Sequence, residues 1–421
     1  MAYKVSHPAK KISGTINLPS SKSESNRMLM IRAISGIDID IQNISPAKDT
    51  ATLKAILEKV KNTNHTGAEA EVFDVGHAGT TMRFLTAYFS CLEGERILTG
   101  SDRMKKRPIG ELVDALRKLG ADIQYMEEKG FPPLKIIGGT LHGGEIEMKG
   151  SISSQFISAL LLISPLMERG LVLKFTDEVV SVPYINMTLH MMEQHNVYGV
   201  WEADSIHVSK QNYELESEED KSYYIEGDWS SASYLFSLVA LSKEAEITVQ
   251  GLKEDSLQGD SVVRNIFDFF GVKHEWKGQE LHLSKMPVMA EQFQYDFEDC
   301  PDLAQTIAVV VSALKISSIF TGLKTLRIKE TDRAQALQNE LGKFGVKVEI
   351  ISDNEIKLEA SNFHESSQPI ATYQDHRMAL SFAPLALLHD IVFEELPDVV
   401  QKSYPGYWED MKRLGFVIEQ V

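Results

Sequence analysis

Two cations stand among small polar residues at the start of a candidate helix. Lys22 and Arg27 belong to the segment SSKSESNRMLMIR, residues 20–32, in which apolar residues recur with helical spacing from Met28 onward. Serine hydroxyls at such a position cap free backbone N–H groups, and the helix dipole favours negative charge there. The segment therefore predicts a site for a phosphate or a carboxylate. A capped helix with two solvated cations is the alternative interpretation.

Further cations lie where a polar segment meets a candidate helix. They are Arg83, Arg103, Lys105, Lys106, Arg107, Lys329, Arg333, Arg377 and Lys402. Arginine suits bidentate contacts with carboxylate or phosphate, whereas lysine is a point charge that also moves protons. If the helix starts converge, these cations line one cleft for a small substrate with several negative charges. For any single one of them, an exposed surface cation is the alternative.

Two carboxylates occupy the same kind of position. Asp302 precedes a candidate helix, and Glu330 lies between Lys329 and Arg333. In a cation-lined cleft each could exchange a proton with a substrate hydroxyl, or each could act only as a cap or counter-ion. Neutral hydrogen-bonding groups for a phosphate or a polyol are available from Ser153, Ser154, Gln155, Ser181 and Tyr184.

Six similar segments must position these side chains. Each has a small-polar start and then an almost wholly apolar helix, and corresponding positions are roughly 56 to 77 residues apart, which indicates duplication of a large unit. A second helix, apolar on one side only, follows in most of them. In residues 108–120 the apolar face comprises Ile109, Leu112, Val113, Leu116 and Leu119, with Pro108 in the opening turn and Gly120 at the end. We expect inner helices surrounded by sheets and outer helices.

The length of 421 residues exceeds one ordinary core and predicts two domains of an α/β (α+β) fold, with three units each. The expected boundaries give a first domain over residues 19–227 and a second over residues 1–18 plus 228–421. Two chain crossings, near residues 19 and 227, would then form a double hinge that lets the halves close on a ligand. The acidic stretch 214–221 is expected to be solvated surface.

Bulk properties exclude several classes of protein. A net charge of −17 argues against nucleic acid as a partner. The longest apolar runs fall short of the roughly 18 residues that span a bilayer, so no membrane is expected. The amino end lacks an apolar signal-peptide core, and Cys91 and Cys300 form no CxxC motif, which indicates a reducing cytoplasm.

Motifs for other chemistries are missing. The 12 histidines include no HExxH pattern, and the sequence contains no GxxxxGK[ST] loop, no GxGxxG fingerprint and no GxSxG elbow. A shared metal site, ATP use through a P-loop and a nicotinamide cofactor are therefore poorly supported. A Ser–His–Asp triad stays open on composition alone.

Taken together, the motifs identify a family that the chain resembles from about Lys11 to its carboxyl end. They read SSKSESNR, GHAGTTMR, DRMKKRPIGELVDALRKLGA, SSQF, GDWSSASY, PDLAQT, KETDRAQAL, TYQDHRMA and QKSYPGYWEDM. In order and spacing they resemble the 5-enolpyruvylshikimate-3-phosphate synthases, the 3-phosphoshikimate 1-carboxyvinyltransferases among the enolpyruvyl transferases. RPIG, KETDR and DHRMA are the most specific parts.

The resemblance implies a reaction and a fold. The family transfers the enolpyruvyl group of phosphoenolpyruvate to the 5-hydroxyl of shikimate 3-phosphate through a tetrahedral adduct, on the shikimate pathway to chorismate and aromatic amino acids. It uses no metal or organic cofactor and is usually monomeric. Its fold is a two-domain inside-out α/β barrel, with three βαβαββ repeats per domain around buried parallel helices, and the domains close around the substrates.

The resemblance also implies roles for particular residues. Contacts with shikimate 3-phosphate are implied for Lys22, Ser23, Arg27, Ser153, Ser154, Gln155, Ser181, Tyr184, Asp302, Thr325 and Lys329. Contacts with phosphoenolpyruvate are implied for Lys22, His77, Gly79, Arg107, Gln155, Arg333, His376, Arg377 and Lys402. As the catalytic groups we expect Asp302 as base at the 5-hydroxyl and Lys22 with Glu330 as proton-moving groups at the enol.

Four positions depart from the family pattern. His77 stands where Asn usually precedes Ala-Gly-Thr, and Thr325 where Asn often precedes the KETDR segment. Glu24 and Phe84 are unusual beside Ser23 and Arg83. Because His77 and Phe84 flank Gly79, phosphoenolpyruvate affinity and the response to the inhibitor glyphosate do not follow from the resemblance.

Three other functions are alternatives to this one. A UDP-N-acetylglucosamine enolpyruvyl transferase typically uses a loop Cys, whereas residues 104–107 here contain none. A non-enzymatic phosphometabolite-binding relative would be expected to lose Lys22, Asp302 and Glu330, all of which are present. RNA 3′-phosphate cyclisation on a related fold would need a basic surface and ATP, but this chain is acidic.

Overall fold

The computed structural model describes residues 2–62, 70–217, 221–394 and 398–421. The chain divides into two compact units. Unit 1 comprises Met1–Ser20 and Glu226–Val421, and unit 2 comprises Ser21–Ile225. The acidic stretch 214–221 lies partly outside the described residues.

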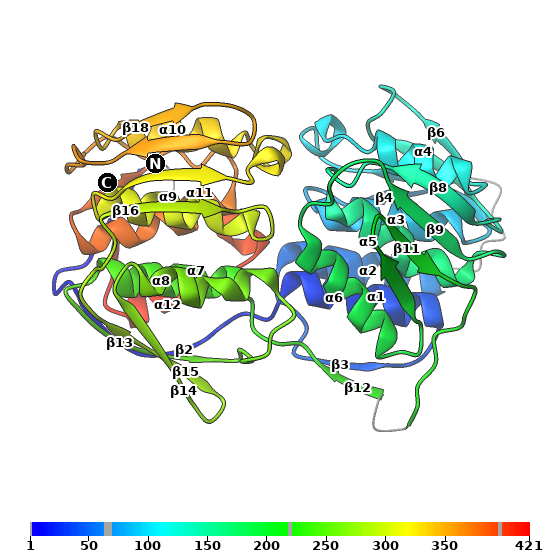
Figure 1. The fold of residues 1–421 in the computed structure, drawn as a ribbon, viewed down its shortest axis with the longest axis horizontal. Helices are drawn as coiled ribbons and strands as arrows, with labels where there is room; N and C mark the ends of the chain where they lie inside the picture. The colour runs from blue at the N-terminus through cyan, green and yellow to red at the C-terminus, as the bar shows by residue number, and fades with distance from the viewer. Residues whose placement is uncertain (1, 63–69, 218–220, 395–397) are drawn as a thin grey trace. The chain divides into compact units, whose positions relative to one another are not determined.

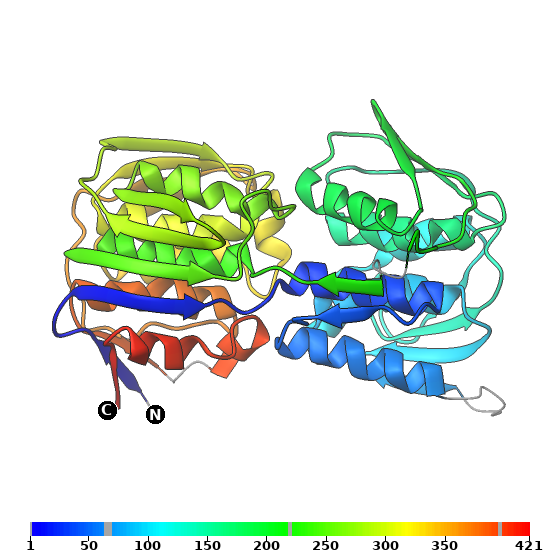
Figure 2. The same ribbon diagram turned by 90° about the horizontal axis from the view of Figure 1, so that it is seen from below.

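One four-stranded sheet pattern recurs in both units, in which a parallel pair is extended by two antiparallel strands. In unit 2 it is formed by β4 (Glu71–Asp74), β5 (Gly94–Thr99), β7 (Leu134–Gly138) and β6 (Asp122–Tyr125), and again by β8 (Gly144–Met148), β9 (Leu171–Phe175), β11 (Ser205–Val208) and β10 (Gly199–Glu202). In unit 1 it is formed by β2 (Lys11–Asn17), β13 (Glu244–Gln250), β15 (Glu280–Lys285) and β14 (Val272–Lys277), and by β16 (Gln292–Asp296), β17 (Ser317–Thr321), β19 (Ile356–Glu359) and β18 (Lys347–Ile350). Figure 2 shows β2, in blue, beside β13.

Two smaller sheets vary this pattern. In unit 1, β20 (Ile391–Phe393), β1 (Tyr3–Ser6) and β21 (Val417–Gln420) pair antiparallel, and Ile370 forms a single parallel bridge to Phe393. Both chain ends therefore complete a third copy (Figure 2). In unit 2, β3 (Asp40–Gln42) pairs in parallel with β12 (Ser222–Tyr224), and among the described residues this pair has no antiparallel extension.

The helices form an inner and an outer set. The inner ones are α1 (Lys22–Ser35), α3 (Gly79–Ser90) and α5 (Ser154–Ile163) in unit 2, and α7 (Trp229–Leu241), α9 (Ala304–Ala313) and α11 (His376–Phe382) in unit 1. The outer ones are α2 (Lys48–Asn62), α4 (Gly110–Lys118), α6 (Val182–Glu193), α8 (Val263–Asp268), α10 (Arg333–Gly342) and α12 (Tyr407–Arg413). Short 3₁₀ turns are η1 (Met104–Lys106), η2 (Ser164–Leu166), η4 (Gly259–Val262), η5 (Pro301–Leu303), η6 (Lys324–Ile328), η7 (Ala383–Leu387) and η8 (Asp398–Lys402).

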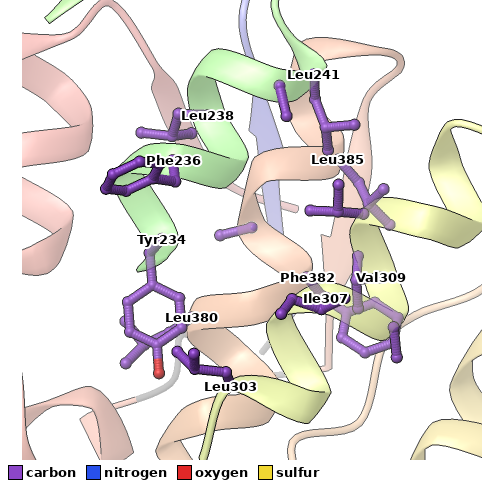
Figure 3. Close-up of a cluster of buried hydrophobic side chains, with 14 of the residues drawn as sticks. Tyr234, Phe236, Leu238, Leu241, Leu303, Ile307, Val309, Leu380, Phe382 and Leu385 are labelled. Carbon is purple, nitrogen blue, oxygen red and sulfur yellow. The ribbon is translucent and has the colours of Figure 1, made fainter. Parts of the chain in front are cut away.

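The inner helices of unit 1 pack against one another. In Figure 1, α7, α9 and α11 lie between the sheets that contain β13 and β18. Figure 3 shows Phe236, Ile307 and Phe382, one from each helix, in their common core, and all three are fully buried. Burial of such a side chain contributes roughly 1.5–3 kcal/mol, so apolar contact on every side fixes these helices in the interior. For α7, α9 and α11, the prediction that the almost wholly apolar helices lie inside is confirmed.

The outer helix α4 shows how closely the helical pattern predicts burial. All five residues of its predicted apolar face are buried, and Gly120 has a positive φ of 108° after the helix end. The helix begins at Gly110, however, and not in a turn opened by Pro108. The carbonyl of Pro108 accepts a 3.2 Å hydrogen bond from Arg83, which holds this part of the chain ahead of the helix.

Candidate active site

Arg333 lies at the centre of a buried group of charges in unit 1. Its side chain is 1% exposed. The guanidinium donates hydrogen bonds to Asp302 (2.9 Å), Glu330 (3.1 Å) and Asp375 (2.8 Å). Carboxylates from three separate segments of the chain therefore meet at one arginine.

Three more cations complete this group. Nη2 of Arg377 donates to Oδ2 of Asp302 at 2.7 Å, Nζ of Lys329 lies 3.6 Å from Oδ1 of Asp302, and Lys402 contacts Glu330. We call the set the Arg333 cluster, and it comprises Asp302, Lys329, Glu330, Arg333, Asp375, Arg377 and Lys402. Its four cations outnumber its three carboxylates, so the cluster retains positive charge that a small anion would neutralise.

The charges in this cluster shift the pKa of several groups. Burial raises the pKa of the Asp302 carboxyl, but Arg377, Lys329 and Arg333 outweigh burial and hold that pKa well below its usual range. Burial lowers the pKa of Lys329. Burial also acts to lower the pKa of Arg333, but the surrounding carboxylates raise it above the usual arginine value. Asp302 is therefore ionised and only weakly basic while these cations surround it.

The starts of α7, α9 and α11 meet at the cluster. Ser230 belongs to the first turn of α7, Asp302 lies in η5 directly before α9, and Arg377 belongs to the first turn of α11. Arg377 joins them, because its Nη2 lies 3.4 Å from Oγ of Ser230 and its Nη1 donates to the Tyr234 hydroxyl at 3.3 Å. In Figure 3 the Tyr234 side chain points toward the end of the helices where Leu303 lies. Within unit 1 the expected convergence of helix starts is observed.

Two other predicted site residues of unit 1, His376 and Thr325, lie outside the Arg333 cluster. His376 is buried in the first turn of α11, and its Nδ1 lies 3.6 Å from Oδ1 of Asp375, so it borders the Arg333 cluster. Thr325 lies in η6 with its hydroxyl buried. Among the described residues no hydrogen bond or ion pair joins Thr325 to the cluster.

In unit 2 the first segment forms the capped helix that its sequence predicts. Ser21 caps α1 by accepting a hydrogen bond from the backbone N–H of Glu24. Nζ of Lys22 lies 3.4 Å from Oδ2 of Asp49 on α2, and Ser23 is half-buried beside it. Lys22 thus stands at a helix N-terminus, with its charge partly balanced by Asp49.

Arg27 is deeply engaged with its own unit. It donates to Thr188 (2.7 Å), to Ser158 (3.0 Å) and to the carbonyls of Tyr184 (3.0 Å) and Ser23 (3.1 Å). These bonds use four of the five N–H donors of a guanidinium, so one remains for a ligand. Burial lowers the pKa of Arg27 to about 10. Its main role in this arrangement is to hold α1, α5 and α6 together.

Arg107 is buried beside the start of α3. Its guanidinium lies against Gly79, where a Cβ would collide with it. The side chain is 8% exposed overall, and among the described residues Arg107 has no ion-pair partner. A buried cation without a counter-ion is costly, and an anionic ligand would relieve that cost. Gln155 of α5 donates to Thr80 of α3 at 3.1 Å, so the starts of these two helices adjoin.

The predicted hydroxyl groups stand at the starts of α5 and α6. Ser153 caps α5 by accepting from the backbone N–H of Gln155, and Ser154 is the first residue of that helix. Ser181 precedes α6 with φ at +56°, a strained conformation for a residue with a side chain. The backbone N–H of Tyr184 donates to the carbonyl of Ser181 at 3.1 Å.

Three of the four residues that depart from the family pattern have local partners. Glu24 is buried and accepts a 2.8 Å hydrogen bond from the Tyr223 hydroxyl, and the guanidinium of Arg27 lies 5.8 Å from the centre of the buried Phe84 ring. His77 is exposed, and its Nδ1 lies 2.9 Å from Oγ of Ser101.

Some supporting residues were not predicted from the sequence. Asp375 caps α11 and pairs with Arg333, and its place in the DHRMA motif indicates only the start of a repeat. The sequence marks Arg83 only as a cation at a helix start. In the structure it is buried and donates to the carbonyls of Gly79 (3.0 Å) and Pro108 (3.2 Å). It thereby joins the start of α3 to the residue that follows Arg107. Asp49, which pairs with Lys22, lies in the sequence PAKDT and belongs to no motif that would predict this contact.

The described part of the chain has neither a metal-binding cluster nor a membrane-spanning helix. It contains no group of three or more His, Cys, Asp or Glu side chains that could hold a metal ion. No helix there has the length and hydropathy that crossing a bilayer requires.

The chain is an α/β protein built from one repeated sheet pattern, and the cations at its helix starts favour the binding of a small anion. The sequence profile described as "EPSP synthase (3-phosphoshikimate 1-carboxyvinyltransferase)" matches residues 6–411. The chain therefore belongs to the EPSP synthase family.

Individual relatives agree with this assignment. The chain is 44% identical to a 3-phosphoshikimate 1-carboxyvinyltransferase of Bacteroides fragilis strain YCH46, over 100% of this chain and 99% of that protein. It is 36% identical to the protein of the same name from Vibrio atlanticus strain LGP32, over 97% of this chain and 98% of the relative. The fold is similar to the solved structure of EPSP synthase from Acinetobacter baumannii, with a TM-score of 0.75, 20% identity and full coverage of both chains.

Proposed function

We propose that this protein transfers the enolpyruvyl group of phosphoenolpyruvate to the 5-hydroxyl of shikimate 3-phosphate and releases phosphate, on the shikimate pathway to chorismate. Family membership over residues 6–411 supports the reaction. The observation that carries the proposal is the Arg333 cluster, which combines a carboxylate that can accept a proton with cations that can hold two anionic substrates.

Formation of the adduct requires two proton movements. Asp302 takes the proton of the 5-hydroxyl, and Lys22, with Glu330, delivers a proton to carbon 3 of the enol. The hydroxyl oxygen bonds to carbon 2, which gives a tetrahedral adduct. The bond between carbon 2 and the phosphate oxygen then breaks, and phosphate leaves with the proton that Asp302 took up. Carbon 3 returns a proton to Lys22 and Glu330, which restores the double bond.

Substrate binding makes Asp302 a better base. In the free protein the pKa of Asp302 is held low by Arg377, Lys329 and Arg333. An anionic substrate that binds the same cations offsets their charge, so the pKa of Asp302 rises toward the range that suits a general base. The ion pairs of the free protein are therefore compatible with a proton-transfer role and do not reduce Asp302 to a counter-ion.

The proposed substrate contacts follow the resemblance of the motifs. For phosphoenolpyruvate they are Lys22, His77, Gly79, Arg107, Gln155, Arg333, His376, Arg377 and Lys402. For shikimate 3-phosphate they are Lys22, Ser23, Arg27, Ser153, Ser154, Gln155, Ser181, Tyr184, Asp302, Thr325 and Lys329. Arg27 contributes chiefly by positioning α1, α5 and α6, because only one of its N–H donors remains uncommitted.

The finer features of the fold belong to the same proposal. Repetition of one sheet pattern around inner helices supports an inside-out α/β barrel in each unit. The chain crosses between the units at Ser20–Ser21 and at Ile225–Glu226. We propose that these crossings form the double hinge expected near residues 19 and 227, and that substrates drive closure. A monomeric state and a cytoplasmic location stay predictions from the sequence.

One assay tests the function. Purified protein is incubated with phosphoenolpyruvate and either shikimate 3-phosphate or UDP-N-acetylglucosamine, and phosphate release is measured. We expect turnover with shikimate 3-phosphate only. Turnover with the nucleotide sugar, or with neither acceptor, would overturn the proposal.

A further inference from the structure

Asp260 is a buried carboxyl next to the Arg333 cluster with no role so far. It lies in η4 and is 2% exposed. Its Oδ2 accepts a hydrogen bond from Oγ of Ser230. Its Oδ1 is also buried and has no hydrogen-bond partner among the described residues. A buried carboxylate is costly when half of it is unsatisfied, so this environment favours the neutral acid.

A short path leads from Asp260 to the cluster. Ser230 donates to Asp260, and the same Ser230 hydroxyl lies 3.4 Å from Nη2 of Arg377. That nitrogen also donates to Asp302 at 2.7 Å. One hydroxyl therefore separates Asp260 from the guanidinium to which phosphoenolpyruvate is proposed to bind.

The groups that face Asp260 come from several elements. Burial, Asp302 before α9 and the α7 cap Asp228 raise the pKa of Asp260, whereas Arg377 of α11 and the hydrogen bond from Ser230 lower it, and together they bring it to about 7. The thiol of Cys300 also faces Asp260, and its pKa is raised by burial and by that carboxylate. Asp260 therefore changes its charge within the pH range in which enzymes of this kind work.

We infer that Asp260 is a positioning residue that sets the affinity of Arg377 for the anionic substrate, because neutral Asp260 leaves the guanidinium charge to the substrate and ionised Asp260 competes for it. This inference rests on the proposed function. By linkage, a substrate anion that neutralises Arg377 also favours the protonated form of Asp260. Phosphoenolpyruvate binding is therefore accompanied by proton uptake at this carboxyl.

The sign of the effect on catalysis follows. As pH rises through 7, Asp260 ionises and the affinity for phosphoenolpyruvate falls. A coupling of about one pKa unit would change KM about tenfold between the two forms. Because the Ser230 hydroxyl lies between Asp260 and Arg377, we expect the effect to fall on KM and to leave kcat nearly constant.

Asp260→Asn provides the test, since the amide keeps the shape and can still bond Ser230 but cannot ionise. KM for phosphoenolpyruvate is measured at saturating shikimate 3-phosphate from pH 5.5 to 9. We expect the ratio of wild-type to variant KM to be near one at low pH and to rise about tenfold above neutral pH. Titration of the substrate's own phosphate is common to both enzymes and cancels in the ratio. A ratio that stays constant with pH would overturn the inference.

Two further measurements test whether ionisation of Asp260 causes the change in KM. Ser230→Ala removes the hydrogen bond that favours the ionised form, so the pH at which KM rises should move upward and not disappear. In thermal unfolding, the raised pKa of Asp260 means that wild type loses stability relative to Asp260→Asn as pH rises from 5 to 8. A pH-independent difference in Tm would also count against the inference. Failure of wild type to release phosphate at any pH would instead overturn the proposed function.

Discussion

Nη1 of Arg333 lies 2.9 Å from Oδ1 of Asp302, and the arginine side chain is almost completely buried. Arg377 holds the second oxygen of the same carboxylate at 2.7 Å. The proposed base is therefore fixed in position by two arginines before any substrate arrives. The two arginines lower the pKa of Asp302 in the free protein. They also fix the orientation of its carboxylate toward the hydroxyl from which it is proposed to take a proton.

Asp302→Asn should abolish most turnover and leave substrate binding largely intact. The amide keeps the shape of the side chain, but its single oxygen can accept from only one of Arg333 and Arg377, and it cannot take a proton. Loss of a general base typically costs about 10²- to 10⁴-fold in rate. The measurement is kcat for phosphate release, together with the Kd of shikimate 3-phosphate by calorimetry. Asp255→Asn, an exposed change in the same unit, is the matched control and should retain wild-type kcat.

Asp302→Asn should also change how the free energy of unfolding depends on pH. The pKa of Asp302 is depressed in the folded protein, so its ion pairs stabilise the fold above the unfolded value of about 4 and lose that contribution as pH falls through the folded pKa. At pH 7, Asp302→Asn should be less stable by about 3 kcal/mol. Urea unfolding at pH 7, 5 and 3 measures this. The gap between the two proteins should narrow toward pH 3, and a constant gap would contradict the assigned ion pairs.

The helices and many of the charged residues could be predicted because their signals are local. Apolar residues at helical spacing gave the buried face of α4, and uninterrupted apolar runs gave the inner helices. The cations of the Arg333 cluster could be picked out because each stands where a polar segment meets a helix or turn. Their motifs then identified the family.

Contacts between distant segments could not be predicted in this way. Asp375 pairs with Arg333 across 42 positions, and Ser230 contacts Asp260 across 30. Neither separation corresponds to the repeat of a helix or a strand. These residues meet only because of tertiary packing, which the sequence pattern does not show. The hydrogen bonds of Arg27 to Ser158, Thr188 and two carbonyls could not be predicted for the same reason, and they add a supporting role to the substrate contact proposed for that residue.

Asp177→Asn should weaken the binding of shikimate 3-phosphate. Oδ1 of Asp177 accepts from the backbone N–H groups of Gly150 (2.5 Å) and Ser151 (3.0 Å), and Oδ2 accepts from Oγ of Ser151 (2.5 Å). These bonds hold the loop before Ser153, and the side-chain bond from Ser151 is the main cause of the lowered pKa of Asp177. Loss of one or two such bonds corresponds to about a three- to tenfold rise in KM.

The control for that loop is the next residue along the chain. Glu178 is exposed, so Glu178→Gln should leave both KM values unchanged. KM for phosphoenolpyruvate should respond less than KM for shikimate 3-phosphate in Asp177→Asn. Equal changes in both, or none in either, would show that the loop does not position the acceptor substrate.

Gly79→Ala should impair phosphoenolpyruvate binding by displacing Arg107. A Cβ at Gly79 would collide with the guanidinium of Arg107, and this end of a flexible side chain can move only by giving up its position beside α3. Arg107 has no ion pair among the described residues that would hold it in place. We expect KM for phosphoenolpyruvate to rise by tenfold or more, as expected for a clamp worth about 2 to 4 kcal/mol, while KM for shikimate 3-phosphate changes little.

Gly139→Ala is the matched control, since nothing lies within 4 Å of a Cβ built at Gly139. It should bind both substrates as wild type does and unfold at the same temperature. If Gly79→Ala raised both KM values together, the cause would be a shift of α3 as a whole, which carries Arg83 and Thr80 as well as Gly79. A selective loss of phosphoenolpyruvate affinity separates displacement of one arginine from movement of the helix, because only Arg107 has its charged group against the added methyl.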